Sequence, residues 1–482
     1  MTEAIDKEVT DVIGFGELPN LRQLYDDFGR VAEISAMHRD LEARGIKHIH
    51  FEYVTLQGRV LSKVIPTHLW PEAAHKGLRL GYNVAGGFAS GLNGQVFGEG
   101  GETGVEGVMV PDLSTLAVLP WDPEFARVRC WHYRLLEDAD RAGEPVLTDT
   151  RHLLALALSR LERQTGIKAV SGCEPEMSWF RDIKELGSRS ALLPENVNPA
   201  YHFGHTEDMR PVLKKVTEYA TAMGLEMIQA AYEDFGQLEC NFQHDDFLLT
   251  ADRLVTYRQI CVQVARELGY IATFMPKPAA GILGNGCHHN VSFWRDGQNI
   301  LIDPAVSGRE NLTPEGLAAV GGLLTHAPAL MALFAPTVNS YKRYANAAWS
   351  PDTANWGYDN RRCAIRVLPG RLEVRLPDAV ANPYLSHLGL LQAVVTGWAT
   401  KADPGPPQTG LQPVSDAERP VFGALPRTLG DALSVFQADE VISGALPQEL
   451  RQVFVDCKTD EWNRYCAAIT DWDLANYLNY LP

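Results

Sequence analysis

The sequence predicts a protein that combines amphipathic helices with β-strands. Residues 48–66 alternate between apolar and polar side chains on either side of a Gln-Gly pair, which is typical of a β-hairpin. Residues 254–268 carry apolar side chains at spacings of three and four, and the glycine that follows predicts the end of a helix. Residues 149–166 begin with a capping aspartate and end with a glycine, which indicates a second helix.

Size and composition indicate a globular protein. The chain has 482 residues, which is enough for two or three domains, with 45% hydrophobic and 21% charged residues. No apolar run is expected to reach the roughly 20 residues of a membrane span, and no signal peptide is expected. The eight scattered cysteines lack CxxC spacing and fit a reducing cytoplasm. A net charge of −17 argues against nucleic acid and anionic membrane partners.

The remaining segments give weaker signals. Residues 1–20 are expected to form a mobile tail, and residues 21–44 a helix. Residues 78–102 are rich in glycine and small side chains, as in a flexible surface loop, and 402–414 is expected to be another loop. The amphipathic C-terminal stretch 462–482 either packs on its own chain or joins two rings of subunits.

Acidic residues gather in two strand-like segments. Glu174 and Glu176 are two residues apart and therefore face the same side of a strand, where two carboxylates repel each other and resist burial. A divalent cation removes that penalty, and carboxylate ligands with an occasional histidine suit Mg²⁺ or Mn²⁺. Glu233 and Glu239 repeat the pattern, and His288 follows a glycine-rich turn. One such glutamate alone would be taken as a solvated surface residue.

Seven short motifs occur in a fixed order: EPE, GQLE, FMPKP, GNGCHH, NSYKR, NRRCAIR and RLEVRLPDAVANPYL. From about residue 45 to the C-terminus the chain thereby resembles the glutamine synthetase superfamily, and within it the γ-glutamylamide synthetases. The resemblance implies an α+β fold with two domains. An N-terminal arm and β-grasp domain is expected at residues 1–128, and a catalytic domain at 129–482, in which a curved antiparallel sheet forms a funnel surrounded by helices.

The resemblance implies two or three Mg²⁺ or Mn²⁺ ions per subunit, with ATP as co-substrate. One metal, near the glutamate, is assigned to Glu176, Glu233 and Glu239. The other, between the ATP phosphates, is assigned to Glu174, His288 and Glu373. The neighbouring His289 has no implied role and is expected to be a hydrogen-bonded core histidine.

The resemblance also implies roles for arginines and for the glycine-rich turn. A guanidinium binds carboxylate and phosphate through paired hydrogen bonds and keeps its charge. The residues implied to bind glutamate are Glu176, Gly284, His288, Arg343 and Arg375. Those implied to bind ATP are Phe242, Asn290, Ser292, Arg361, Arg366 and Arg371. The implied catalytic residues are Arg343, Arg361 and Trp349.

Departures from the family pattern carry information about the substrate. Ammonia-using members of the family have an aspartate in the loop that corresponds to residues 83–88, and this chain has no carboxylate there. They also have a glutamate in the flap that closes the site, and this chain has Trp349 at that position. A site without these anions binds ammonium poorly, and an aromatic lining favours an organic amine. Asn290 replaces a common histidine, and the short spacing after Glu233 makes that residue the least secure metal ligand.

We therefore expect an ATP-dependent ligase that joins the γ-carboxylate of L-glutamate to an organic amine through γ-glutamyl phosphate. An aromatic amine such as aniline is favoured and a small alkylamine comes next, with Phe88, Trp349, Trp356 and Tyr358 as candidate lining residues. The alternatives are an ammonia-using glutamine synthetase and a non-catalytic ring protein of the same fold. The family also implies a cytoplasmic homo-oligomer of hexameric rings or a dodecamer.

Overall fold

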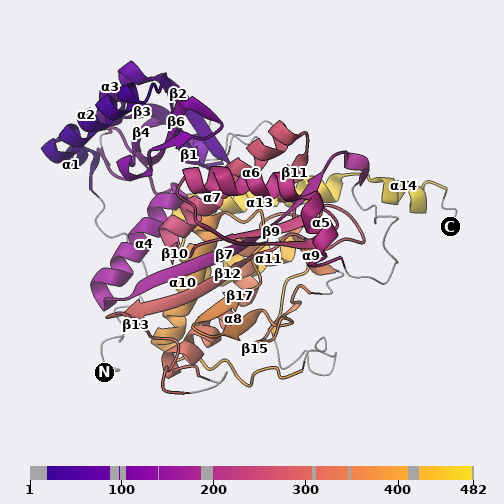
Figure 1. Ribbon diagram of the computed structural model, residues 1–482. Coiled ribbons are helices and arrows are strands. Elements are labelled where there is room, and N and C mark those ends of the chain that lie inside the picture. The colour runs from indigo at the N-terminus through magenta and orange to yellow at the C-terminus, as the bar shows by residue number, and fades with distance from the viewer. Residues whose placement is uncertain are drawn as a thin grey trace.

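The computed structural model describes residues 19–86, 97, 105–138, 140–185, 199–306, 311–345, 349–410 and 423–479. The elements up to β6 lie together at one end of the molecule, and the remaining elements form a larger body (Figure 1). The expected N-terminal tail and most of the expected glycine-rich loop lie outside the described residues.

The N-terminal part is a sheet covered by helices. Its strand order is β2-β1-β6-β4-β3, with β5 paired to β6 and with β1 and β6 parallel. The apolar faces of α2 and α3 pack on this sheet, and the Trp70 indole donates to the Ile34 carbonyl at 3.1 Å. The strands are β1 His48–Val54, β2 Val60–Pro66, β3 Leu78–Gly81, β4 Glu106–Pro111, β5 Ala117–Leu119 and β6 Asp122–Tyr133, and the helices are α1 Leu21–Tyr25, α2 Phe28–Ala43 and α3 Trp70–Lys76.

The local expectations for this part are largely confirmed. The hairpin 48–66 is present as β1 and β2. The helix expected at 21–44 is divided, because Asp27 accepts from the amides of Gly29 and Arg30 and thereby starts α2 as a separate helix. Strand β6 pairs with β4 as far as Tyr133, so the domain boundary expected after residue 128 falls inside a strand.

The larger body is built on a second, mainly antiparallel sheet. Its strand order is β15-β16-β17-β12-β7-β9-β8, with the short strands β10 and β11 paired to β7 and β13 paired to β12. The long strands are β7 Lys168–Phe180, β8 Met227–Asp234, β9 Gln237–Phe242, β12 Cys287–Arg295, β16 Ile365–Leu368 and β17 Arg371–Val374. The short ones are β10 Asp245–Asp246, β11 Ile271–Thr273, β13 Gln298–Asn299 and β15 Trp356–Tyr358. Strands β14 Thr353–Ala354 and β18 Gly423–Ala424 pair with each other in a separate two-stranded sheet.

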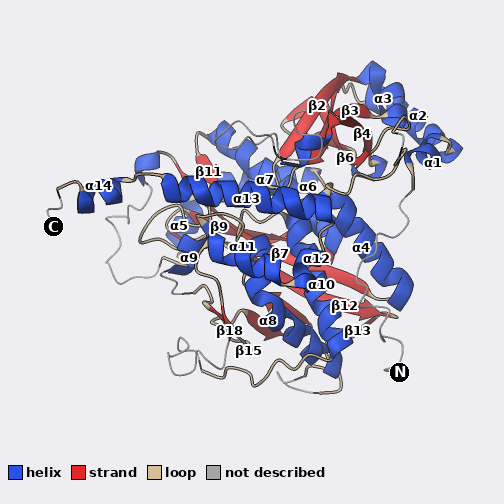
Figure 2. Ribbon diagram, turned by 180° about the vertical axis from the view of Figure 1, so that it is seen from behind, coloured by secondary structure: helices blue, strands red, loops and turns tan. Residues whose placement is uncertain are grey.

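Helices cover one face of this sheet, as the view from behind shows (Figure 2). The caps expected from the sequence are confirmed: Asp149 caps α4, Gly166 ends it at φ 70°, and Gly269 ends α7 at φ 71°. The helices are α4 Thr150–Thr165, α5 Phe203–Asp208, α6 Arg210–Ala222, α7 Phe247–Leu268, α8 Pro314–Phe334, α9 Ser340–Ala345, α10 Pro383–Thr400, α11 Leu429–Ala438, α12 Glu440–Gly444, α13 Gln448–Ala467 and α14 Asp471–Tyr477.

Helix α8 corrects one expectation. It is long and apolar enough to match a membrane span by composition, although no apolar run of that length was expected. Of its most apolar window 72% is buried within the protein, where it packs against α10 and α11. Its apolar length therefore belongs to the core.

A buried network of charges joins the two parts of the chain. Arg129 of β6 lies 3.4 Å from Glu52 of β1 and donates to the Asp252 carbonyl at 3.2 Å. The Asp252 carboxylate in α7 lies 2.7 Å from the Arg151 guanidinium in α4 and accepts from the Tyr384 hydroxyl at 2.6 Å. Each charge has an opposite charge beside it, which is the condition for burying ions in a protein interior.

The end of the chain projects from the body. Helix α14 has no buried residue, and the side chains of Trp472 and Leu478 are 61% and 71% exposed. The helix extends away from the other elements in Figures 1 and 2. The C-terminal stretch was expected either to pack on its own chain or to join two rings of subunits. Helix α14 does not pack on its own chain.

Candidate active site

Six residues assigned to metals from the sequence lie on five neighbouring strands. Going across the sheet, they are Glu373 on β17, His288 on β12, Glu174 and Glu176 on β7, Glu239 on β9 and Glu233 on β8. The register pairs His288 directly with Glu174, and Glu176 directly with Glu239. Directly paired residues of antiparallel strands face the same side, so these four side chains share the face opposite the helices.

Three of the six form a tight group. Donor atoms of Glu174, His288 and Glu373 all lie within 4.8 Å of one another. The His288 Nδ1 atom is 3.2 Å from a Glu174 carboxylate oxygen and 3.4 Å from a Glu373 oxygen. Burial alone would raise the pKa of Glu174, but the hydrogen bond and charge of His288 lower it to about 2. This is the composition expected of a site for a hard divalent cation.

The other three carboxylates repel one another. Burial and the charges of Glu174 and Glu176 raise the pKa of Glu239 to about 9. Burial and the charge of Glu176 raise the pKa of Glu233 to about 7. Protein groups compensate this charge only in part, because Glu176 accepts from the Gly286 amide at 2.6 Å and Glu239 from the Asn241 amide at 2.9 Å. A cation would supply the missing charge, so the residues fit a second Mg²⁺ or Mn²⁺.

A bulge brings Glu233 to this face despite its short spacing from Glu239. Ala231 of β8 pairs with Glu239 of β9, and the register then shifts between Tyr232 and Asp234. The intervening turn is closed by Gly236 at φ 69°. Glu233 is two residues beyond Ala231 and therefore lies on the same side of the strand as Glu239.

The glycine-rich turn lies tightly against Arg343. A Cβ atom on Gly284 would stand 2.5 Å from the Pro276 carbonyl oxygen and 2.7 Å from Arg343 Cγ. A Cβ atom on Gly286 would stand 2.6 Å from an Arg343 nitrogen, so neither position can hold a larger residue without displacing this arginine. Arg343 is buried, its Nη2 atom lies 3.5 Å from His288 Nε2, and its Nε atom has no partner among the described residues. A buried cation with spare donors beside a metal group can bind a substrate carboxylate.

Three of the arginines expected to bind substrates are linked to the same carboxylates. Arg366 donates to Glu373 at 2.9 Å, and Arg375 forms a short contact with the other Glu373 oxygen. Arg371 donates to the Asn290 side chain at 2.7 Å, and Asn290 in turn donates to Glu174 at 2.8 Å. These cations offset part of the negative charge of the carboxylates.

The structure adds Tyr201, which the sequence gave no reason to select. Its side chain lies near Arg361 and Glu233, which act on its pKa, and its backbone has a positive φ of 62°. A tyrosine held in a rarely adopted conformation near an arginine and a carboxylate is a candidate substrate contact. It follows a stretch without periodicity, so no sequence pattern distinguished it.

Trp349 is half exposed and contacts an arginine. The Arg362 guanidinium stacks over its ring at 4.6 Å from the ring centre, and Arg362 follows Arg361 directly in the chain. A cation–π contact of this kind fixes the orientation of an exposed indole. The position of Phe88, the other aromatic residue expected nearby, lies outside the described residues.

Two sequence assignments need correction. Phe242 was expected to contact ATP, but its side chain is buried against Tyr257, because it lies on the opposite face of β9 from Glu239 and Asn241. Trp356 was expected to line the amine site, but it is buried in the main core with its indole donating to the Gly405 carbonyl. Ser292 shares the site face of β12 and accepts from the Trp294 indole at 2.9 Å.

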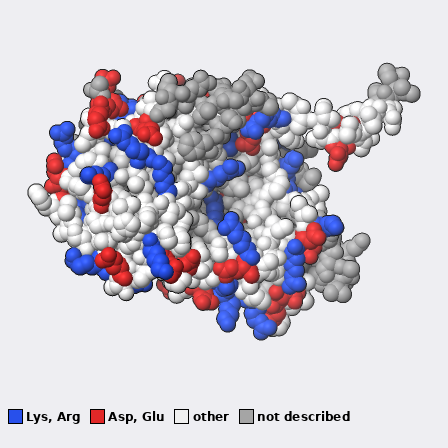
Figure 3. All heavy atoms as spheres, turned by 90° about the horizontal axis from the view of Figure 1, so that it is seen from above, with Lys and Arg blue, Asp and Glu red and all other residues white. Residues whose placement is uncertain are grey.

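The surface around this body carries both signs of charge. On the face shown in Figure 3, Lys and Arg side chains lie among Asp and Glu side chains and form no continuous area of one sign.

Comparison with known proteins gives a consistent result. Residues 147–477 match the model of the glutamine synthetase catalytic domain. The chain is 32% identical over 459 residues to a glutamate–methylamine ligase of Methyloversatilis universalis, covering 91% of this chain and 98% of that one. It is 34% identical over 402 residues to a glutamine synthetase of Thermococcus kodakarensis, covering 78% and 86% of the two chains. A solved structure titled as a GmaS complex with ADP superposes with a TM-score of 0.80 at 29% identity, covering 92% of this chain and 99% of that one.

Proposed function

This chain belongs to the glutamine synthetase family, and we propose that it joins the γ-carboxylate of L-glutamate to an organic amine at the expense of ATP. The choice of an organic amine rests on Trp349. Its indole is held by the Arg362 guanidinium, and ammonia-using relatives have an acidic flap residue at this position. The similarity to a glutamate–methylamine ligase supports an amine in place of ammonia.

The first half of the reaction forms γ-glutamyl phosphate. An oxygen of the glutamate γ-carboxylate attacks the γ-phosphorus of ATP, and the bond to ADP breaks. Arg343, Arg375 and the tight glycine turn hold the glutamate, while Arg366 and Arg371 approach the phosphates. The two groups of carboxylates would hold divalent ions, which supply positive charge to the phosphate oxygens.

The second half forms the amide. The amine nitrogen attacks the γ-carbon of the acyl phosphate, the bond to phosphate breaks, and the nitrogen loses a proton. Arg361 stabilises the negative charge that develops on the phosphate, and Tyr201 and Glu233 lie beside it. Trp349 keeps water from the acyl phosphate, which would otherwise be hydrolysed.

The amine that fits this site best is an arylamine such as aniline, with small alkylamines next. An aniline is neutral at pH 7, whereas an alkylamine is mostly protonated and must lose a proton before it can attack. The two acids that ammonia-using relatives place near the amine are replaced here by 83–88 and Trp349. An indole contributes stacking area for an aromatic ring and no charge for an ammonium ion.

The test is the ratio of kcat/KM for aniline to that for methylamine and ammonia, in the wild type, Trp349→Glu and Trp349→Phe. Trp349→Glu should lower the ratio of aniline to ammonia at least about tenfold, which corresponds to about 1.4 kcal/mol in transition-state binding. Trp349→Phe keeps an aromatic ring and should change the ratio little. A wild type that prefers ammonia, or a ratio that does not move in Trp349→Glu, would refute the proposal.

We further propose that the subunits assemble into closed rings, as the family does. The exposed aromatic residues of α14 support an assembly contact. Sedimentation of the full chain tests this: a single-subunit species with full ligase activity would contradict it.

A further inference from the structure

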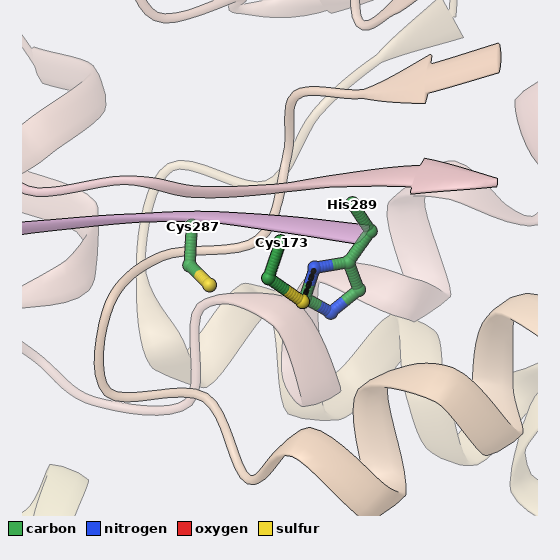
Figure 4. A group of neighbouring side chains, drawn as sticks. All are labelled: Cys173, Cys287 and His289. Carbon is green, nitrogen blue, oxygen red and sulfur yellow. Dashed lines mark hydrogen bonds between the residues drawn. The ribbon is translucent and has the colours of Figure 1, made fainter. Parts of the chain in front are cut away.

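A second group of potential metal ligands lies behind the active site. Cys173 of β7 and Cys287 and His289 of β12 are all buried, and their donor atoms lie within 4.8 Å of one another. His289 is the direct cross-strand partner of Cys173, and Cys287 stands two residues before it on β12. Figure 4 shows the three side chains on the same side of the two strands. This is the helix-covered face, opposite Glu174 and His288.

The tautomer of His289 is fixed by its neighbours. The Ser386 hydroxyl donates to the Pro383 carbonyl at 3.1 Å, so its oxygen is left to accept from His289 Nε2, 2.8 Å away. The proton is therefore on Nε2, and the Nδ1 lone pair faces the Cys173 sulfur. Metal-binding histidines are oriented in the same way, by a hydrogen bond from the nitrogen that does not bind the metal. The ring is also stacked on His387 with 4.5 Å between centres.

The spacing of the donors suits a common metal ion. Sulfur and imidazole nitrogen bound to one metal at about 2.3 and 2.0 Å lie roughly 3.5 to 3.7 Å apart for bond angles between tetrahedral and trigonal. The distance from Cys173 Sγ to His289 Nδ1 is 3.6 Å. Little movement of β7 or β12 is therefore needed to bind a metal.

A buried arginine lies beside the two cysteines and supplies a positive charge to them. Arg258 of α7 is close enough for its charge to interact with both Cys173 and Cys287, and its desolvation lowers its pKa. It donates to the Ala381 carbonyl at 3.0 Å, and its Nε atom has no partner among the described residues. The guanidinium offsets part of the cost of burying two thiolates in the protein interior.

We propose that Cys173, Cys287 and His289 bind one soft monovalent metal ion, Cu(I). Thiolate ligands select Cu(I) over harder ions, and a three-coordinate arrangement suits it. Binding forms two copper–sulfur bonds and one copper–nitrogen bond, releases the two thiol protons to solvent, and transfers no electron. The bound ion joins β7 to β12 directly behind the catalytic carboxylates and should raise the unfolding temperature.

The experiment uses the full-length protein, kept reduced and free of oxygen, with the exposed Cys466 replaced by serine. The protein is incubated for a long time with Cu(I) buffered by a chromophoric chelator, since the site is buried and opens slowly. Copper per chain, the ultraviolet thiolate-to-copper absorption and the number of sulfur neighbours by X-ray absorption are measured. We expect one Cu(I) with two sulfur neighbours per chain and a higher unfolding temperature.

Variants separate this site from other thiols. Cys173→Ser and Cys287→Ser should lose the tightly bound Cu(I), and His289→Gln should weaken binding at least about tenfold through loss of one ligand. Cys261→Ser is the matched control, because Cys261 is a buried thiol of α7 whose neighbour is Tyr257 rather than a histidine. Circular dichroism shows which variants are folded, and His289→Gln still decides the question if a cysteine variant fails to fold.

Three results would overturn the proposal. The first is that the folded protein takes up no stoichiometric Cu(I). The second is that uptake of Cu(I) is unchanged in both His289→Gln and Cys173→Ser. The third is that the protein binds Zn²⁺ as tightly as Cu(I). None of these measurements depends on the ligase substrate, so the outcome is independent of the function proposed above.

Discussion

Replacing Glu239 by glutamine is expected to stabilise the metal-free protein while it removes the ligase activity. Without a cation, burial and the charges of Glu174 and Glu176 raise the pKa of Glu239 from 4.5 to about 9. At pH 7 this carboxyl must therefore take up a proton when the chain folds. That uptake costs about 1.4 kcal/mol for each pH unit above the unfolded pKa, or about 3 kcal/mol in all. Glutamine has the same shape and no such cost.

The sign of the pH dependence follows from the direction of the shift. A group with a raised pKa contributes stability that is fully present below its unfolded pKa of 4.5 and is lost as the pH rises toward about 9. The metal-free wild type should therefore lose stability over this interval relative to Glu239→Gln. Saturating Mg²⁺ should reverse the order, because the cation binds the wild-type carboxylate and stabilises the folded state.

The assay is urea unfolding at one fixed protein concentration, in EDTA and in Mg²⁺, at about pH 5.5 and about pH 8. The control is Glu226→Gln, which removes an exposed carboxylate just before β8 and should have no effect beyond a few tenths of a kcal/mol. The reasoning fails if Glu239→Gln is less stable than the wild type in EDTA, or if Mg²⁺ stabilises both proteins equally.

Three further predictions concern other parts of the structure. Asn290→Ala should raise the KM for ATP about tenfold with little change in unfolding, measured by steady-state kinetics, because the amide links a metal-facing carboxylate to a nucleotide-side arginine. Asp252→Ala should lower the free energy of unfolding by about 3 to 5 kcal/mol in urea, since it leaves Arg151 buried without its main partner; a loss below 1 kcal/mol would contradict this. Burial lowers the pKa of His132 from 6.5 to about 4, so its contribution to stability is present above pH 6.5 and is lost as the pH falls toward 4. His132→Asn should therefore show a shallower loss in this interval, by up to about 1.4 kcal/mol per pH unit, whereas exposed His68→Asn should follow the wild type.

The sequence predicted the features that depend on local chemistry. Helix caps such as Asp149 and Gly269 are encoded within a few residues, and these were confirmed. The metal-facing glutamates were recognisable because closely spaced carboxylates among apolar residues are costly without a cation. The structure brings Glu174, His288 and Glu373 together as that pattern and the family resemblance implied, and their roles as metal ligands stay a prediction.

Features that depend on which face of a strand a residue occupies were harder to predict. Phe242 was assigned to the nucleotide although strand alternation directs its side chain into the core. Trp356 was assigned to the amine although its side chain packs in the main core. Tyr201 was missed because its contacts to Arg361 and Glu233 come from distant segments, and no local pattern records them. Tertiary placement decided these three cases.

Even-numbered and odd-numbered residues of strand β7 face opposite sides of the sheet and have different chemical character. Its even positions Glu174 and Glu176 face the substrate side, and its odd positions Cys173 and Met177 face the helices. Inserting or deleting one residue early in this strand would exchange the two sets, burying carboxylates among apolar helices and turning a thiol toward the nucleotide. Length changes in the loops carry no such penalty. Natural variation in the chain length of this protein should therefore be confined to the connections between strands, and within β7 only changes by two residues would preserve the site.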